Sequence, residues 1–294
     1  MKLLMEKEMP ELRDKLGQLL WQQGITPALV KRTARKGRFA LAMHGVSPAF
    51  DPTLPTSVQP HHDAKEMRLT LSWLKDHFQF LTPREFLETD QPGVLLTFDD
   101  GFANNVEILL PILEEFNAPA VFFVTLQHIL TPSDWLPATR RLVQLLWQNP
   151  KDVPEMTARA FFDGMTVSQL QTCGSHPLIT VASHTIGHPY LSKCSQSELE
   201  HEILGSKQML EKWLGQSIDL FAYPTGDYDE RTLRQVQQAG YTAAFAVDPL
   251  NLGSQRFEIP RVGLYASDSA YLGLKLSGLH RRPLRGKILL QDSL

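Results

Sequence analysis

Two adjacent carboxylates, Asp99 and Asp100, directly follow the apolar run Val94–Phe98 and precede Gly101. A continuous apolar run is typical of a strand buried on both faces, and α/β sheets place their chemistry at the carboxyl ends of such strands. Neighbouring side chains at a strand end point in different directions, so one carboxylate can bind a metal while the other meets a substrate. Gly101 permits a sharp turn there. A plain solvated turn remains the alternative for this stretch taken alone.

Histidines close two other apolar runs. His44 follows residues 38–43, and His184 and His188 follow residues 178–182. Two imidazoles four residues apart can face one ion, and a carboxylate can complete a three-ligand set. Three protein ligands leave an open position for water, which a catalytic metal needs. The residue types therefore indicate a hydrolytic metal centre, with a polar cluster that holds no metal as the alternative.

Strands and helices alternate from about residue 38 to residue 280, which favours one α/β domain. The clearest unit is a strand at 94–98, a helix over 104–116 with a kink at Pro111, and a strand at 120–125. Strand, helix and strand in this order form the βαβ unit of a parallel sheet. Further strands are expected at 38–43, 178–182, 219–223, 242–247 and 257–265. The carboxyl ends of these strands would bring the polar residues together.

The chain divides into a helical and basic N-terminal extension over 1–37 and an α/β domain over 38–294. A helical insert around 126–177 could wall a cleft or cover the sheet. The basic residues within 31–38 could touch an acidic surface or lipid headgroups, but five charges over eight residues are also common in a solvated linker.

Composition excludes several classes of protein. The net charge of −3 and a pI near 6.4 show no basic excess, so a nucleic-acid partner is not expected. No apolar run has the length of a membrane span. Charged residues at 6–8 interrupt any apolar signal core, so a cytoplasmic location is expected.

The two polar motifs resemble those of a known family. Thr97–Gly101 (TFDDG) and Ser183–Pro189 (SHTIGHP) are similar to the first two motifs of the polysaccharide deacetylases with a NodB-homology domain, carbohydrate esterase family 4. The resemblance spans roughly residues 38–270 in motif order. It implies a distorted (β/α) barrel and the metal-dependent removal of N-acetyl groups from amino sugars.

Carried over by position, the resemblance makes Asp100, His184 and His188 the ligands of a divalent metal. Zinc is the first expectation, with cobalt, nickel or manganese as alternatives. Asp99 would be the general base that takes a proton from the water held by the metal. Such an ion suits amide hydrolysis because it lowers the pKa of bound water towards neutrality.

The stretch Phe221–Gly226 resembles the third motif of the family, where the N–H of Thr225 would help to bind the oxyanion. Tyr223 and Pro224 are candidates for substrate contact, with core packing as the alternative for Tyr223. The motif departs from the family pattern because Ala222 stands where many members carry an arginine that steadies the base. Arg261 is a candidate to supply that charge from another strand, with a surface ion pair as the alternative.

The acid that protonates the leaving amine has two candidates. The late histidine motif of the family is in doubt here, because His280 lies in a basic tail beyond the last clear strand. The stretch Met43–Val46 is similar to the early strand end that supplies the acid in the branch that deacetylates poly-N-acetylglucosamine. We therefore expect His44 rather than His280 to be the acid.

The expected function is that of a metal-dependent N-deacetylase. Its substrate would be a glycan that contains N-acetylhexosamine, or a lipid- or nucleotide-linked precursor of one. The alternatives are hydrolysis of another amide or an O-acetyl ester by the same site, and an inactive carbohydrate-binding or scaffold subunit with the same fold.

Overall fold

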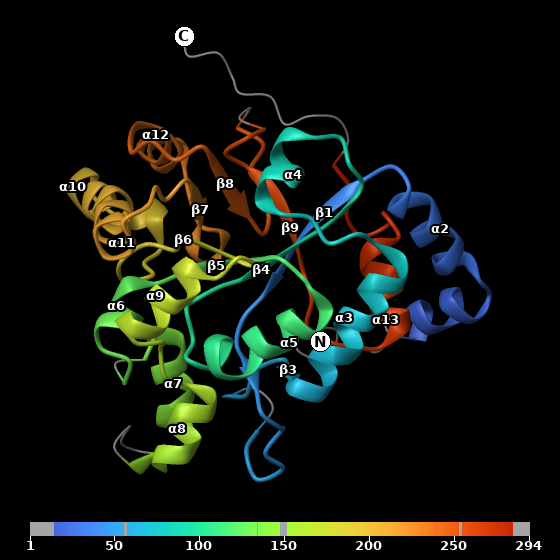
Figure 1. Cartoon of the computed structure of the whole chain (residues 1–294), viewed down its shortest axis with the longest axis horizontal. Helices are drawn as coiled ribbons and strands as arrows, with labels where there is room; N and C mark the ends of the chain where they lie inside the picture. The colour runs from blue at the N-terminus through green and yellow to red at the C-terminus, as the bar shows by residue number, and fades with distance from the viewer. Residues whose placement is uncertain (1–14, 56–57, 134, 148–151, 253–254, 285–294) are drawn as a thin grey trace, which may run out of the picture.

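The computed structural model describes residues 15–55, 58–133, 135–147, 152–252 and 255–284. Within these ranges, seven parallel strands close into a barrel that helices surround (Figure 1). The strands, in their order around the barrel, are β1 (Arg38–Met43), β4 (Gly93–Phe98), β5 (Ala120–Val124), β6 (Ile179–Ser183), β7 (Leu220–Ala222), β8 (Ala243–Ala246) and β9 (Ile259–Gly263). The predicted fold class, a distorted (β/α) barrel, is confirmed.

The strand register brings the polar strand ends to one rim of the barrel. Met43 pairs with Phe98, and the N–H of Asp99 donates to the carbonyl of Met43 at 2.9 Å. Between the neighbouring strands β5 and β6, the N–H of His184 donates to the carbonyl of Val124 at 2.9 Å. The first polar residues after β1, β4 and β6 therefore leave the sheet at its carboxyl edge.

Each strand buries both of its faces, as the continuous apolar runs predict. In β4, Leu95 packs with Val121 and Phe123 in a cluster of the barrel strands, whereas Leu96 and Phe98 pack in the larger cluster shared with the helices. Side chains alternate between the two faces with a period of two. Asp99 therefore follows Leu95 onto the inner face.

Helices cover the outside of the barrel (Figure 1). They include α3 (Ala64–His77), α4 (Pro83–Glu88), α5 (Leu110–Phe116), α10 (Gln196–Glu200), α11 (Ser206–Leu214) and α12 (Glu230–Gln238). Capping boxes at Thr82 and Ser195 begin α4 and α10. The expected kink near Pro111 takes the form of a π-helical segment, Asn105–Leu109, that continues into α5.

The insert over 126–177 forms α6 (Leu126–Leu130), α7 (Pro137–Leu146), α8 (Glu155–Phe161) and α9 (Val167–Ser175). It also bonds to the turn that follows β4. The N–H of Met165 donates to the carbonyl of Gly101, and the N–H of Ala103 donates to the carbonyl of Asp163, both at 2.9 Å. The insert therefore helps to fix the turn that carries the two carboxylates.

Two segments beyond the barrel strands pack against each other. α2 (Ile25–Ala34) lies beside α13 (Ser269–Leu276) (Figure 1). The sequence analysis does not predict this second helix. The hydroxyl of Thr33 donates to the carbonyl of Leu276 at 2.8 Å. No helix in the described part of the chain is long and apolar enough to cross a membrane.

Candidate active site

Asp100, His184 and His188 form a cluster at the carboxyl rim of the barrel. One ligand atom from each residue lies within 4.8 Å of the others. Oδ1 of Asp100 is 3.5 Å from Nε2 of His188 and 3.8 Å from Nε2 of His184. It is buried and has no hydrogen-bond partner among the described residues. Buried polar atoms are normally satisfied, so this convergent set fits a cation at its centre.

The protonation state of His184 suits a metal ligand. Burial lowers its pKa to about 4, so the imidazole is neutral at neutral pH. Its Nδ1–H donates a hydrogen bond to the carbonyl of Ala222 at 2.8 Å. Nε2 is then left with its lone pair towards Asp100. A carbonyl that fixes the tautomer in this way is the usual outer partner of a metal-bound histidine.

The backbone of the cluster is strained. Asp100 has φ 78°, Thr185 has φ 70° and His188 has φ 56°, all in the left-handed region that non-glycine residues rarely adopt. Such residues cost about 1–3 kcal/mol each and persist where the surrounding structure holds them. The strain therefore lies in the residues that bring the three side chains together.

Glu202 holds the loop that carries both histidines, a residue that the sequence reading missed. Its Oε2 accepts hydrogen bonds from the N–H groups of Ile186 at 2.9 Å and Gly187 at 2.8 Å. The N–H of His188 donates to Oγ1 of Thr185 at 3.0 Å. Glu202 lies in a π-helical segment, His201–Gly205, between α10 and α11. Only the folded structure places it beside the loop.

His128 supports the other side of the cluster. Its ring lies in α6, with Nδ1 3.3 Å from the carbonyl of Asp100 and Nε2 2.9 Å from the carbonyl of Phe162. The backbone of Gly164 passes so close that an added Cβ would lie 1.9 Å from the carbonyl oxygen of His128. This contact requires glycine, and it locks the insert onto the turn after β4.

Asp99 lies on the inner face and forms a buried ion pair with Arg261 of β9. Arg261 donates from Nη1 to Oδ1 at 2.6 Å and from Nη2 to Oδ2 at 2.7 Å, and both side chains are at least 95% buried. Burial alone would raise the pKa of Asp99, but Arg261 and then His184 outweigh it and hold that pKa at about 2. Nη1 of Arg261 also donates to Oγ1 of Thr97 at 3.1 Å. Asp99 is therefore a fixed, ionised carboxylate.

His44 lies at the same rim, at the end of β1. It is half-buried, its Nδ1 has no hydrogen-bond partner in the described part of the chain, and its electrostatic interaction helps to lower the pKa of Asp99. His61 lies close enough to His44 to interact with it electrostatically. Burial first, and His44 second, lower the pKa of His61, whose ring is 4.6 Å from that of Tyr265. His61 and Tyr265 therefore form a pair of rings next to the candidate acid.

The third motif is divided between the rim and the core. Thr225 is exposed and has φ 55°, which holds its backbone in a left-handed turn. Tyr223 is fully buried, its hydroxyl donates to the carbonyl of Phe257 at 3.0 Å, and its ring stacks on Tyr228 at 4.2 Å. The side chain of Tyr223 therefore packs in the core, which was the alternative for this residue, and Pro224 is buried as well.

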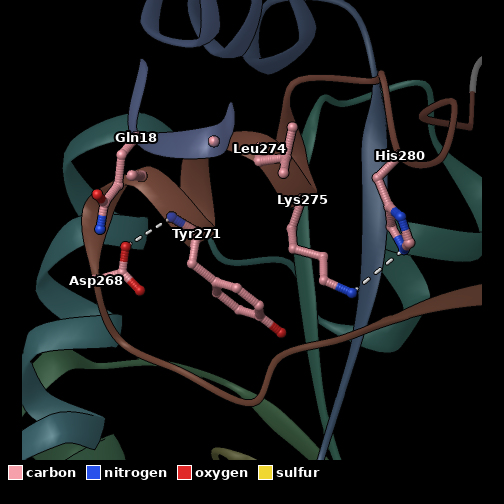
Figure 2. Close-up of a pocket in the computed structure, with 8 residues that line it drawn as sticks. Gln18, Asp268, Tyr271, Leu274, Lys275 and His280 are labelled. Atoms are coloured by element: carbon pink, nitrogen blue, oxygen red, sulfur yellow. Dashed lines mark hydrogen bonds between the residues drawn. The ribbon is translucent and has the colours of Figure 1, made fainter. Parts of the chain in front are cut away.

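His280 lies apart from this cluster. It is exposed on the segment after α13, where its Nε2 is 3.4 Å from Nζ of Lys275 (Figure 2). The two residues line a small pocket together with Gln18, Asp268 and Tyr271. None of the candidate ligands, the base or His44 lines that pocket. Contacts join Asp100 to His184 and His188, and Asp99 to Arg261, and His44 interacts electrostatically with Asp99.

Comparison with known proteins adds to this geometry. A family model described as polysaccharide deacetylase matches residues 87–244. A Bacillus subtilis (strain 168) polysaccharide deacetylase, YxkH, is 25% identical over 63% of this chain and 58% of its own length. The poly-β-1,6-N-acetyl-D-glucosamine N-deacetylase of Staphylococcus aureus (strain N315) is 24% identical over 72% of this chain and 70% of its own length.

Solved structures agree in fold. IcaB from Ammonifex degensii matches 82% of this chain and 97% of its own with a TM-score of 0.61 at 20% identity. The Streptococcus pyogenes deacetylase PplD, in complex with acetate, matches 81% of this chain and 96% of its own with a TM-score of 0.60 at 20% identity. His44 and Arg261 both lie outside the stretch that the family model covers.

Proposed function

Because the chain belongs to the polysaccharide deacetylase family, we propose that it is a metal-dependent hydrolase that removes N-acetyl groups from an N-acetylhexosamine glycan. The observation that carries this proposal is the pair of adjacent carboxylates at the end of β4. Asp99 is ion-paired with Arg261, whereas Asp100 faces two imidazoles with a buried oxygen that has no hydrogen-bond partner within the described ranges.

Asp100, His184 and His188 would hold the divalent ion, with zinc as the first candidate because two imidazoles and one carboxylate suit it. When bound, the ion supplies a Lewis acid that makes water nucleophilic near neutral pH. The other steps belong to protein groups that lie around the cluster.

Asp99 takes the proton of the attacking water, and Arg261 keeps the carboxylate ionised and oriented through its two hydrogen bonds. The N–H of Thr225 donates to the oxyanion that forms when the water adds to the acetamide carbonyl. His44 gives a proton to the nitrogen as the C–N bond breaks, so that acetate and a free amine leave the site.

The relatives support the choice of the first substrates. The Staphylococcus aureus relative is named for poly-β-1,6-N-acetyl-D-glucosamine, so oligomers of that polymer are the first substrates to test. Lipid- and nucleotide-linked N-acetylglucosamine belong in the same panel, because the site geometry does not distinguish the length of the glycan.

Acetate release tests the proposal. Purified protein loaded with zinc should release acetate from at least one member of the panel, and a chelator should abolish the release. Asp99→Asn should lower the rate by roughly 10²–10⁴-fold, as loss of a general base does, while it keeps a stoichiometric metal. Metal content measured by mass spectrometry separates this loss from failure to load. Release that survives both the chelator and Asp99→Asn would contradict the mechanism.

A further inference from the structure

Two long stretches of the sequence contain no acidic residue. Residues 15–50 and 269–291 together hold eleven of the 29 Lys and Arg residues of the chain and none of its 32 Asp and Glu residues. The fold places parts of both stretches side by side, because α2 packs on α13 (Figure 1). A chain with a net charge of −3 therefore brings several cations together where α2 packs on α13 and the segment that follows it.

The cations of this region differ in their partners, and Arg281 pairs with Asp248 at 2.7 Å. Five of them are exposed and form no ion pair in the part of the chain that the structure describes: Lys31, Arg32, Arg35, Lys36 and Arg282. Exposed arginines elsewhere on the molecule do pair with carboxylates, among them Arg84, Arg159 and Arg234. No carboxylate of the described residues lies within ion-pair distance of these five side chains. We call them and the aliphatic side chains around them the basic face.

Aliphatic side chains lie among these cations. α2 buries Thr26, Val30 and Thr33, and the side of the helix next to this buried face carries Ile25, Leu29 and Arg32 at helical spacing. Ile25 is 42% exposed, and Leu279 on the segment after α13 is 59% exposed.

A groove of about 480 Å³ runs between α2 and the segment 277–283. Leu29, Arg32, Leu279 and Arg282 line it, so each side of the groove brings one guanidinium and one leucine. A ligand in this groove would meet positive charge and apolar surface together.

We propose that the basic face docks on an anionic phospholipid surface. Lipid phosphates would meet Arg32 and Arg282, while Leu29 and Leu279 enter the boundary between headgroups and acyl chains. Basic surfaces with exposed aliphatic residues bind the interface of anionic membranes in this way, and each Lys or Arg near the surface adds about 1 kcal/mol, or about fivefold in affinity. A nucleic acid or free phosphate would satisfy the guanidinium groups and leave the leucines in water.

Docking on this face would leave the candidate active site accessible. Lys36 and Gly37 lead directly into Arg38, the first residue of β1, and an added Cβ on Gly37 would clash with Pro283 of the groove. The basic face therefore lies near the amino end of β1, whereas Asp99 and His184 follow the carboxyl ends of β4 and β6. Variants of the basic face should leave turnover of soluble substrates unchanged.

Vesicle sedimentation tests the proposal without any need for activity. The full chain is mixed with vesicles of phosphatidylcholine alone, or of phosphatidylcholine with an equal amount of phosphatidylglycerol. We expect binding only to the anionic vesicles. The triple variant Arg32→Gln, Arg35→Gln, Lys36→Gln should bind about a hundredfold more weakly, from about fivefold for each cation. The matched control is Arg84→Gln, Arg159→Gln, Arg234→Gln, which removes three exposed cations from other surfaces and should bind like the wild type.

Leu279→Ser distinguishes a membrane from other anions. It should weaken binding to anionic vesicles severalfold and leave any binding of inorganic phosphate or a short DNA duplex unchanged. Far-UV circular dichroism and thermal melting check that each variant is folded. Equal binding to both kinds of vesicle, equal losses in the triple variant and its control, or tighter binding of the duplex than of the vesicles would each overturn the proposal.

Discussion

Asp99 and Asp100 are neighbours in sequence, but their carboxylates have different hydrogen-bond partners. Both oxygens of Asp99 accept hydrogen bonds from Arg261 inside the barrel, and the residue is 3% exposed. Oδ1 of Asp100 receives no hydrogen bond from the residues that the structure describes, and it faces Nε2 of His184 and His188. One strand end therefore gives two identical side chains different surroundings. Asp99 is held as an anion by Arg261, and Asp100 is a candidate ligand for a cation.

The two carboxylates also depend on different parts of the chain. The partner of Asp99 comes from β9, so it needs the barrel to close. The partners of Asp100 come from the loop after β6, which Glu202 holds. Substitutions that remove one support at a time should therefore separate folding and base function from metal binding.

The largest effect is expected when Asp99 loses its buried cation. Arg261→Met leaves an ionised carboxylate without its partner inside the barrel, which should cost about 3–5 kcal/mol of unfolding free energy. Because the folded pKa of Asp99, about 2, lies below its ordinary value of 3.8, the pair stabilises the wild type above that ordinary value. This stabilisation is lost as the pH falls towards 2. Urea unfolding at neutral pH measures the cost.

The control for Arg261→Met is Arg84→Met. Arg84 pairs with Glu88 on the surface of α4, with its side chain 86% exposed, so the loss should stay below about 1 kcal/mol. If the two variants unfold at the same urea concentration, Asp99 is not held by a buried pair. Arg261→Lys should restore part of the stability but less of the activity, because a single ammonium cannot donate to both oxygens in the same fork geometry.

The two carboxylates should separate in a metal-binding assay. Asp100→Asn removes a candidate ligand and should lower zinc affinity by more than the roughly 10–100-fold typical of outer partners. Asp99→Asn should leave the zinc stoichiometry unchanged and lower turnover instead. Competition with a fluorescent zinc chelator measures the first effect, and acetate release measures the second. Equal zinc affinities in the two variants would remove the proposed division of roles.

The acid is the next test, because His44 and His280 lie in different places. His44→Ala should lower kcat by roughly 10²–10⁴-fold with a smaller change in KM, as loss of a general acid does. His280→Ala should leave both constants unchanged, since His280 lines the pocket beside Lys275 and not the candidate metal cluster. The reverse pattern would move the acid to the C-terminal segment.

Much of the site could be predicted because its signals are local. The apolar run before Asp99 and Asp100 identifies a strand end, and the spacing of His184 and His188 is short enough to read directly. Arg261 could be named only from the missing charge at Ala222, and its contact with Asp99 depends on barrel closure.

Other residues had no local signal. Glu202 reaches its loop through a π-helical segment, and His128 reaches Asp100 through the insert. Tyr223 had a signal that favours core packing: it lies two residues after Phe221, and a period of two puts both side chains in the outer core, where they pack together.

Glu202 offers the smallest and most selective test. Glu202→Ala leaves the N–H groups of Ile186 and Gly187 without their acceptor, which should cost about 1–3 kcal/mol of unfolding free energy. The loop would then hold its strained histidines less firmly, so zinc affinity should fall roughly 10–100-fold, the range for outer partners of a metal site. The neighbouring Glu200 is exposed, and Glu200→Ala is the matched control.

Zinc affinity decides whether Glu202 acts through the metal ligands. Glu202→Gln keeps one oxygen that can accept from the same N–H groups, so it should recover more zinc affinity than Glu202→Ala. A purely structural role predicts that stability falls while the zinc affinity of the folded fraction stays at the wild-type value. That outcome would mean that Glu202 stabilises the fold without positioning the metal ligands. The candidate metal site around Asp100 would then depend on its own turn and on His128, and not on the hydrogen bonds of Glu202.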